Sequence, residues 1–267
     1  MSFNQEIRDF QRELETSCLG RRLCALETTT STNRVAAELA AETEGEGLLV
    51  IADQQTSGRG RLGRQWFSPA GQSLLFSLLL RPCLEQEKFP QLAALTAISL
   101  HQTLTAFFPK LPLGLKWPND ILADGRKISG ILCEAGQCQG HPPHVVVGLG
   151  LNVSTPRENF PPELQDSASS LLTLSGELVP RYHLLAHFLG FLESNYQRWQ
   201  DEGNLQGFLR YWQNFDALRG QPIRVDTPCG QIHGIADGLT EDGRLRLLQD
   251  GKPQLIYAGD VIHARKS

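Results

Sequence analysis

The stretch Gly58-Arg59-Gly60-Arg61-Leu62-Gly63-Arg64-Gln65-Trp66 combines three glycines, three arginines and a tryptophan. Glycine lets backbone N–H groups approach a ligand closely, and arginine presents a charged planar fork to phosphate or carboxylate. The face of a tryptophan can pack against a purine. This glycine–arginine loop therefore predicts a site for an acidic small molecule together with a nucleotide.

Two apolar segments flank the loop and hold it on a folded scaffold. Residues 48–52 and 73–81 are strongly apolar, which is typical of strands buried on both faces. The alternatives are a flexible surface loop and a segment that binds nucleic acid without specificity. A net charge of −4 and a pI near 6.0 offer no general attraction for a polyanion. We therefore expect no DNA partner.

The bulk composition is that of an ordinary globular protein. The 267 residues, 40% hydrophobic and 20% charged, have room for one large domain and a small one. No apolar run reaches the about 18 residues of a membrane span, and the first residues lack a secretory signal pattern. The six cysteines have neither CxxC nor zinc-finger spacing, so we expect reduced thiols, no protein-held metal and a cytoplasmic location, with no membrane partner.

Predicted helices and strands mix along the chain without strict alternation, which favours an α+β fold with a mixed sheet. Spacing of apolar residues predicts helices over 2–20, 89–108, 182–201 and 205–215, and strands over 23–27, 48–52, 73–81, 113–117, 127–135 and 145–153. The residues before the first strand are too few for a helix–turn–helix module with its recognition helix.

The composition changes near residue 219. Beyond it, glycines separate short strand-like runs at 223–225, 232–235, 245–248 and 255–257. This pattern is typical of a small β-barrel. We therefore predict a large domain over residues 1–219 and a small barrel domain over 220–267.

Two polar groups near the first strands are candidates for contacts to a ligand amide or urea. Ser31, Thr32 and Asn33 precede a predicted helix, and Gln55 follows a predicted buried strand. The alternative for the first group is a helix cap, and for Gln55 it is a solvated side chain.

Two further segments carry candidate groups. Asn119 and Asp120 follow Lys116-Trp117-Pro118, and Lys127 opens a strand whose next residues are small or apolar. A lysine there can bridge a carboxylate and a phosphate; the alternative is a hairpin with charged turn residues. In Gly148-Leu149-Gly150-Leu151-Asn152, glycines in a buried strand indicate either a ligand edge or a β-bulge.

These segments, in this order and at these separations, resemble those of the biotin–protein ligases, also called biotin–acetyl-CoA-carboxylase ligases. The resemblance covers nearly the whole chain. It implies a catalytic domain of the class II aminoacyl-tRNA-synthetase-like, biotin–lipoate ligase type, followed by an SH3-like barrel. It points to the monofunctional type, because the N-terminal DNA-binding module of bifunctional members is not predicted here. Leu62 also stands where some members have arginine.

The resemblance implies that biotin and ATP form biotinyl-5′-AMP and pyrophosphate, and that the biotinyl group then passes to a lysine of a biotin carboxyl carrier protein of acetyl-CoA carboxylase. The implied catalytic residues are Arg61, Asp120 and Lys127. The implied contacts are Ser31, Thr32, Asn33 and Gln55 to the ureido ring; Arg59, Gly60 and Arg61 to the valerate and phosphate; Trp66 to adenine; Asn119 and Asp120 to phosphates and Mg²⁺; Lys127 to the carboxylate and α-phosphate; and Gly150 and Asn152 to the nucleotide.

Two other functions stay open at this point. A lipoate or octanoate ligase needs a longer apolar channel and no ureido contacts, which the polar set at 31–33 and Gln55 disfavours. A non-catalytic biotin-binding regulator needs no phosphate-neutralising residues, whereas Lys127 and the arginines are present. The oligomeric state is open as well, with a homodimer through a sheet edge as one alternative.

Overall fold

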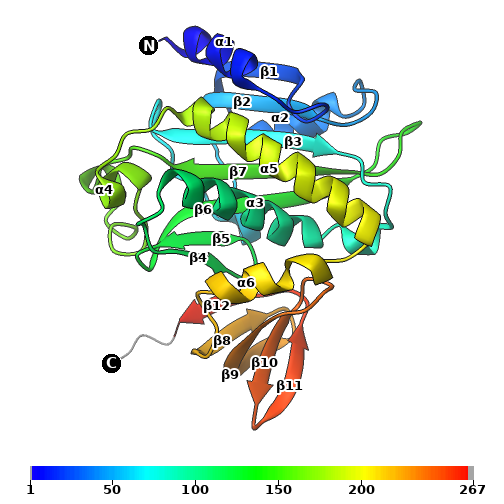
Figure 1. Cartoon of the computed structure of the whole chain (residues 1–267), viewed down its shortest axis with the longest axis vertical. Coiled ribbons are helices and arrows are strands. Elements are labelled where there is room, and N and C mark those ends of the chain that lie inside the picture. The colour runs from blue at the N-terminus through cyan, green and yellow to red at the C-terminus, as the bar shows by residue number, and fades with distance from the viewer. Residues whose placement is uncertain (1, 264–267) are drawn as a thin grey trace.

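The computed structural model describes residues 2–263 and contains a seven-stranded mixed sheet (Figure 1). Only β1 and β2 pair in parallel, and the other neighbours are antiparallel. The strand order across the sheet is β1 (Arg22–Thr29), β2 (Leu48–Gln55), β3 (Ser73–Leu80), β7 (His144–Asn152), β6 (Arg126–Gly136), β5 (Asp120–Ala123) and β4 (Leu113–Lys116).

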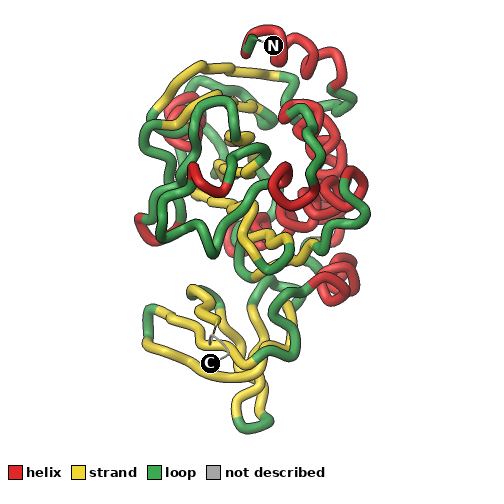
Figure 2. Tube along the Cα trace, turned by 90° about the vertical axis from the view of Figure 1, so that its left-hand side faces the viewer, coloured by secondary structure: helices red, strands yellow, loops and turns green. Residues whose placement is uncertain are grey.

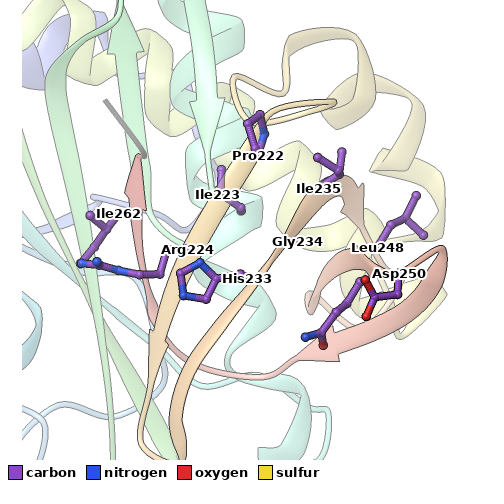
Figure 3. Close-up of a pocket in the computed structure, with 10 residues that line it drawn as sticks. Pro222, Ile223, Arg224, His233, Gly234, Ile235, Leu248, Asp250 and Ile262 are labelled. Carbon is purple, nitrogen blue, oxygen red and sulfur yellow. The ribbon is translucent and has the colours of Figure 1, made fainter. Parts of the chain in front are cut away.

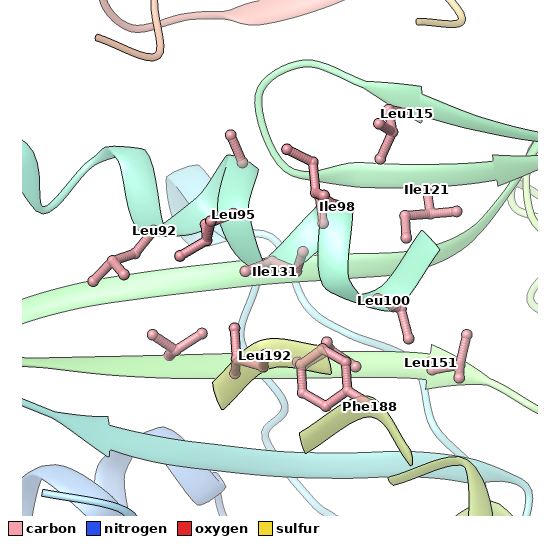
Figure 4. Close-up of a cluster of buried hydrophobic side chains, with 14 of the residues drawn as sticks. Leu92, Leu95, Ile98, Leu100, Leu115, Ile121, Ile131, Leu151, Phe188 and Leu192 are labelled. Carbon is pink, nitrogen blue, oxygen red and sulfur yellow. The ribbon is translucent and has the colours of Figure 1, made fainter. Parts of the chain in front are cut away.

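Long helices cover one face of this sheet. Helices α3 (Gln91–Phe107) and α5 (Arg181–Glu202) lie side by side in front of it in Figure 1, and α1 (Phe3–Glu13) packs against α5. Figure 4 shows Leu95 and Ile98 of α3 facing the strand residue Ile131. Burial of these apolar side chains is the main contribution to the stability of the large sheet.

The opposite face is covered only in part, by α2 (Thr32–Leu39), which contacts β2, β3 and β7. Strand residues alternate between the two sides as a pleated strand requires: Leu49 belongs to the core on the side of α5, whereas Val50 packs under α2. On β7, Val147 and Leu151 belong to the first core, so Gly150 between them faces the α2 side.

The last strands form a second, antiparallel sheet, reached through α6 (Leu209–Phe215) and set apart from the large sheet in Figure 2. We call it the small unit. Its order is β11 (Lys252–Ile256), β10 (Leu245–Gln249), β9 (Gly230–Leu239), β8 (Pro222–Thr227) and β12 (Asp260–His263). Trp117 Nε1 donates to the Gly243 carbonyl at 3.1 Å and so joins the two sheets.

The α+β class, with a mixed sheet and a small C-terminal β unit, is confirmed. In residues 2–263 the strand pairings of the small unit run in sequence from β11 to β12. The predicted boundary at 219/220 falls between α6 and β8. Division into two domains at that point stays a prediction.

Some predicted element bounds were wrong. The first helix ends at Glu13 and not near residue 20, because the Glu193 carboxylate of α5 accepts from the backbone N–H groups of Ser17, Cys18 and Leu19 at 2.7, 2.7 and 2.9 Å. The predicted strand 255–257 lies earlier, in β11. Elements without a sequence prediction are β12, α4 (Leu171–Ser175) and the short 3₁₀ helices η1 (Arg61–Gly63), η2 (Gln86–Lys88), η3 (Arg157–Asn159) and η4 (Gln206–Phe208).

None of the helices in the described part of the chain is both long enough and apolar enough to cross a membrane.

Candidate functional site

A cavity of about 900 Å³ opens on the α2 side of the large sheet and reaches the small unit. All of the site residues predicted from the sequence line this cavity. They are Ser31, Thr32, Asn33, Gln55, Arg59, Gly60, Arg61, Trp66, Asn119, Asp120, Lys127, Gly150 and Asn152. The structure thus brings segments far apart in sequence to one place, while the role of each residue stays a prediction.

One end of the cavity is built from uncharged polar side chains, and we call it the neutral end. It is lined by Ser31, Thr32, Asn33 and Gln55, and Ser77 supports them from behind. Gln55 Oε1 accepts from the Thr32 backbone N–H at 2.8 Å. The Ser77 hydroxyl, in the buried strand β3, lies 2.7 Å from Thr32 Oγ1 and 2.5 Å from Asn33 Oδ1. The hydroxyl–amide set at 31–33 therefore does more than cap a helix, and Ser31 makes no side-chain cap bond at all.

The strand glycines leave room for side chains of the protein itself. A Cβ at Gly148 would overlap the Asn33 carboxamide, and a Cβ at Gly150 would overlap the Trp66 indole. The Trp66 ring also lies against Gly130, the cross-strand partner of Gly150. A β-bulge is therefore not the reason for these glycines, because the β6–β7 register is regular around them.

The glycine–arginine loop folds back on itself as a narrow hairpin. Trp66 N–H donates to the Gly58 carbonyl at 2.9 Å, and Gly60 N–H donates to the Arg64 carbonyl at 2.7 Å. Leu62 lies at the tip with φ +54° and a 75% exposed side chain. Since that backbone region is unfavourable for leucine, the tip is a strained position of the loop.

The other end of the cavity holds charged side chains that pair with one another, and we call it the charged end. It comprises Arg61, Arg64, Lys116, Asp120, Lys127 and Asp260. Lys127 Nζ lies 2.6 Å from Asp120 Oδ1, and Arg61 Nη1 lies 3.5 Å from Asp260 Oδ1. Arg64 also pairs with Asp260, so this carboxylate of the small unit holds two arginines of the loop.

Lys116 and its neighbour Asn119 lie beside these ion pairs and are largely enclosed by the protein. Burial lowers the pKa of Lys116 below its usual 10.5, against the opposing effect of the neighbouring Asp120 carboxylate. Asn119 is fixed on β6, since its Nδ2 donates to the Ile131 carbonyl at 2.6 Å. Its Oδ1 accepts from Arg61 at 3.4 Å.

Sequence reasoning missed one segment that lines the cavity, residues 160–168. Its backbone pairs with the start of β6: Lys127 N–H donates to the Ser167 carbonyl at 2.8 Å, and Ser169 N–H donates to Lys127 at 3.0 Å. Asn152 Nδ2 is bonded to the Ser169 carbonyl at 3.0 Å. No residue pattern in this proline-containing stretch indicates such a role.

Asp260, Glu134 and Ser77 were also missed. Ser77 carried a usable signal, because a hydroxyl in the middle of an apolar strand must find a partner. Asp260 carried none, since its place beside the loop depends on how the small unit packs.

A second cavity of about 500 Å³ lies in the small unit (Figure 3). Its polar lining includes Arg224, His233 and Asp250, and none of the nominated residues borders it. In residues 2–263, no three His, Cys, Asp or Glu side chains cluster in a way that could hold a metal ion.

Comparison with known proteins identifies the family. Residues 25–152 match the Biotin/lipoate A/B protein ligase family, and residues 219–264 match the Biotin protein ligase C terminal domain. The biotin–acetyl-CoA-carboxylase ligase of Mycobacterium tuberculosis is 34% identical over 265 residues, which cover 96% of each chain. This chain belongs to the biotin protein ligase family.

Two further family members extend the likeness. The bifunctional ligase/repressor BirA of Bacillus subtilis is 35% identical over 93% of this chain and 76% of its own length. The structure of the biotin protein ligase from Aquifex aeolicus in complex with biotin and ATP has a TM-score of 0.78 at 29% identity, covering 91% of this chain and 98% of that one. Family membership was thus predictable from the motifs alone.

Proposed function

We propose that this chain is an ATP-dependent biotin–protein ligase that makes biotinyl-5′-AMP and transfers the biotinyl group to a lysine of a biotin carboxyl carrier protein. One observation carries the proposal. A single cavity joins an end built from uncharged hydrogen-bonding groups to an end lined by arginines and lysines. Biotin has the matching polarity, with a ureido ring at one end and a carboxylate at the other.

At the neutral end, Ser31, Thr32 and Asn33 bind the ureido group, together with Gln55. Thr32, Asn33 and Gln55 are already ordered by hydrogen bonds with one another and with Ser77. Pre-ordered partners reduce the entropy lost when a ligand binds.

At the charged end, the chemistry requires two anions to meet. A biotin carboxylate oxygen attacks the α-phosphorus of ATP, an O–P bond forms, and the bond to the leaving pyrophosphate breaks. Arg61 and Lys127 lower the repulsion between carboxylate and phosphate, since preorganised cations stabilise charge in the transition state. Arg59, Gly60 and Trp66 close over the intermediate, with Trp66 near the adenine. Asn119, Gly150 and Asn152 border the nucleotide.

The second step uses the same pocket. The uncharged amine of the acceptor lysine attacks the acyl carbon of the mixed anhydride, an amide bond forms, and AMP leaves. The anhydride is sensitive to water, so the glycine–arginine loop excludes solvent until the carrier binds. We expect this loop to be less ordered before ligand binds; amide exchange in the ligand-free protein as slow as in the sheet would contradict a covering role.

Mg²⁺ fits the charged end as an ion brought by ATP. Mg²⁺ is commonly held by one or two carboxylates plus substrate phosphates, and Asp120 and Asp260 both line the cavity beside the cations. When bound, the ion neutralises phosphate charge. Asp120 would hold it, at the cost of its present partner Lys127.

The other candidate functions are less well supported. A lipoate or octanoate ligase has no use for the ordered amide and hydroxyl set at the neutral end. A non-catalytic regulator has no use for Lys127 and Asp120. We propose that the partner is the carboxyl carrier protein of acetyl-CoA carboxylase. We propose the cytoplasm as the location, because ATP is consumed there. A homodimer is the assembly to test by sedimentation.

The decisive experiment incubates the protein with MgATP, a carboxyl carrier domain and either biotin or lipoate. Intact-mass spectrometry should detect a carrier heavier by one biotinyl group with biotin and an unchanged carrier with lipoate. A carrier whose acceptor lysine is replaced by arginine is the control. Lipoylation without biotinylation, or biotin binding with no transfer, would replace the proposal by one of its alternatives.

A further inference from the structure

Glu134 connects the neutral end to the glycine–arginine loop. It lies on β6, two residues beyond Leu132, which lines the cavity. Its Oε2 accepts from Asn33 Nδ2 at 2.8 Å, and its Oε1 lies 2.8 Å from Nη2 of Arg59. One carboxylate therefore bridges the helix that carries Asn33 and the first arginine of the loop.

The Asn33 side of this bridge is fixed. The Asn33 side chain is buried, and its Oδ1 faces the Ser77 hydroxyl at 2.5 Å. Its Nδ2 is shared between Glu134 and the Leu132 carbonyl, which lies at 3.3 Å. Because both ends of the carboxamide are occupied, the amide has one orientation and directs an N–H group at Glu134.

The Arg59 side of this bridge is exposed to solvent and can break without unfolding the protein. Its side chain is 56% exposed and that of Glu134 is 35% exposed. An ion pair of this exposure contributes little to overall stability, but it can shift a local equilibrium by about two- to fivefold. The contact therefore acts on where the loop lies rather than on whether the protein folds.

The arginines of the loop pair with two different carboxylates, those of Glu134 and Asp260. Arg61 and Arg64 pair with Asp260 of the small unit, at the charged end. Arg59 alone of the three pairs with Glu134, beside the neutral end. Among the described contacts of the loop arginines, the Glu134 bridge is thus the one that belongs to the ureido side.

We propose that Glu134 is a positioning residue that couples occupancy of the neutral end to closure of the glycine–arginine loop. A ligand held by Asn33 keeps the carboxamide and Glu134 in place, and Glu134 keeps Arg59 over the ligand. By linkage, the closed loop retains the ligand more strongly. The proposal rests on the proposed function only in naming that ligand as biotin.

The test is Glu134→Gln, which keeps an oxygen for Asn33 but removes the charge that pairs with Arg59. We expect the biotin dissociation constant, measured by calorimetry, to rise about two- to fivefold, while kcat for pyrophosphate release at saturating biotin stays within about twofold. Glu38→Gln is the matched control, because it removes an exposed ion pair with Arg34 on α2, at 2.9 Å.

Repeating the calorimetry in an Arg59→Ala background shows whether Glu134 acts through Arg59. The increase caused by Glu134→Gln should disappear there, because its partner is already gone. An unchanged dissociation constant in the single variant, or the same increase in the Arg59→Ala background, overturns the proposal.

A second readout needs no biotin. Trypsin should cut the ligand-free loop after its arginines faster in Glu134→Gln than in the wild type or in Glu38→Gln. Equal cleavage rates would also overturn the coupling. Absence of biotin binding by the wild type would instead overturn the proposed function, so the two failures are distinguishable.

Discussion

The two ends of the cavity satisfy their polar groups in different ways. At the neutral end, hydroxyl and amide groups bond to one another: Gln55 to Thr32, and Ser77 to both Thr32 and Asn33. At the charged end, three of the cations pair with carboxylates: Lys127 with Asp120, and Arg61 and Arg64 with Asp260.

This difference predicts different responses to ligands. A hydrogen-bonded set of groups with unused donor or acceptor positions can bind a neutral group without rearrangement. A phosphate must instead replace carboxylates that already pair with the cations. These carboxylates neutralise the partly exposed cations while no phosphate is bound. We therefore expect biotin to leave the neutral end unchanged and the nucleotide to separate the ion pairs of the charged end.

Lys127→Ala tests the charged end most severely. Loss of this cation should lower the rate of biotin-dependent pyrophosphate release about a hundredfold or more, since one preorganised charge contributes about 3 kcal/mol to the transition state. Biotin binding without ATP should change far less. Lys110→Ala, at an exposed turn, is the control. Near-normal pyrophosphate release by a folded Lys127→Ala protein would remove Lys127 from the mechanism.

Arg61→Gly tests retention of the intermediate. Arg61 contacts Asn119 and Asp260, so it lies between the large sheet and the small unit. The variant should still form biotinyl-5′-AMP but release it about tenfold faster, measured by a filter assay after a single turnover. Arg34→Ala, on the outer face of α2, should release it like the wild type. Release as slow as in the wild type would show that Arg61 does not hold the adenylate.

Ser77→Ala tests the neutral end. Removal of this buried hydroxyl leaves Asn33 Oδ1 without a donor, which we expect to cost about 1 kcal/mol, or about fivefold in biotin affinity. The KM for ATP should be unaffected. Ser99→Ala is the matched control, a buried hydroxyl on α3 that donates to the Leu95 carbonyl at 2.9 Å. An ATP effect larger than the biotin effect would break the division into two ends.

The pH dependence of the KM for ATP also distinguishes the charged end from the neutral end. Burial lowers the pKa of Lys116, so this lysine loses its charge at a lower pH than an ordinary lysine with a pKa of 10.5. As pH rises toward that range, the charged end becomes less positive and the KM for ATP should increase about threefold. Lys116→Arg stays charged and should shift the increase to higher pH, whereas biotin affinity should change less. The same pH profile in both proteins would exclude Lys116 as its source.

Much of this architecture could be predicted because it depends on local pattern. The largely apolar runs of β3 and β7 indicated buried strands, and the motif order indicated the family. Contacts between distant elements could not be predicted. Asp260 reaches the loop only because the small unit packs against it, and α1 ends early only because Glu193 of α5 binds the following turn.

Glu134 illustrates the same limit. A glutamate near the end of a strand resembles a solvated side chain, and nothing in its neighbours indicates that its two oxygens contact α2 and the loop. Ser77 is the opposite case, since its hydroxyl stands out in an apolar strand and requires a partner.

A crystal structure with a non-hydrolysable biotinyl-adenylate analogue tests the central comparison most directly. We predict that the contacts of Ser77 with Thr32 and Asn33 keep their lengths of 2.7 and 2.5 Å, while Lys127 leaves Asp120, now 2.6 Å away, to contact the analogue. An analogue bound with the Lys127–Asp120 pair intact and the neutral end rearranged would contradict the account.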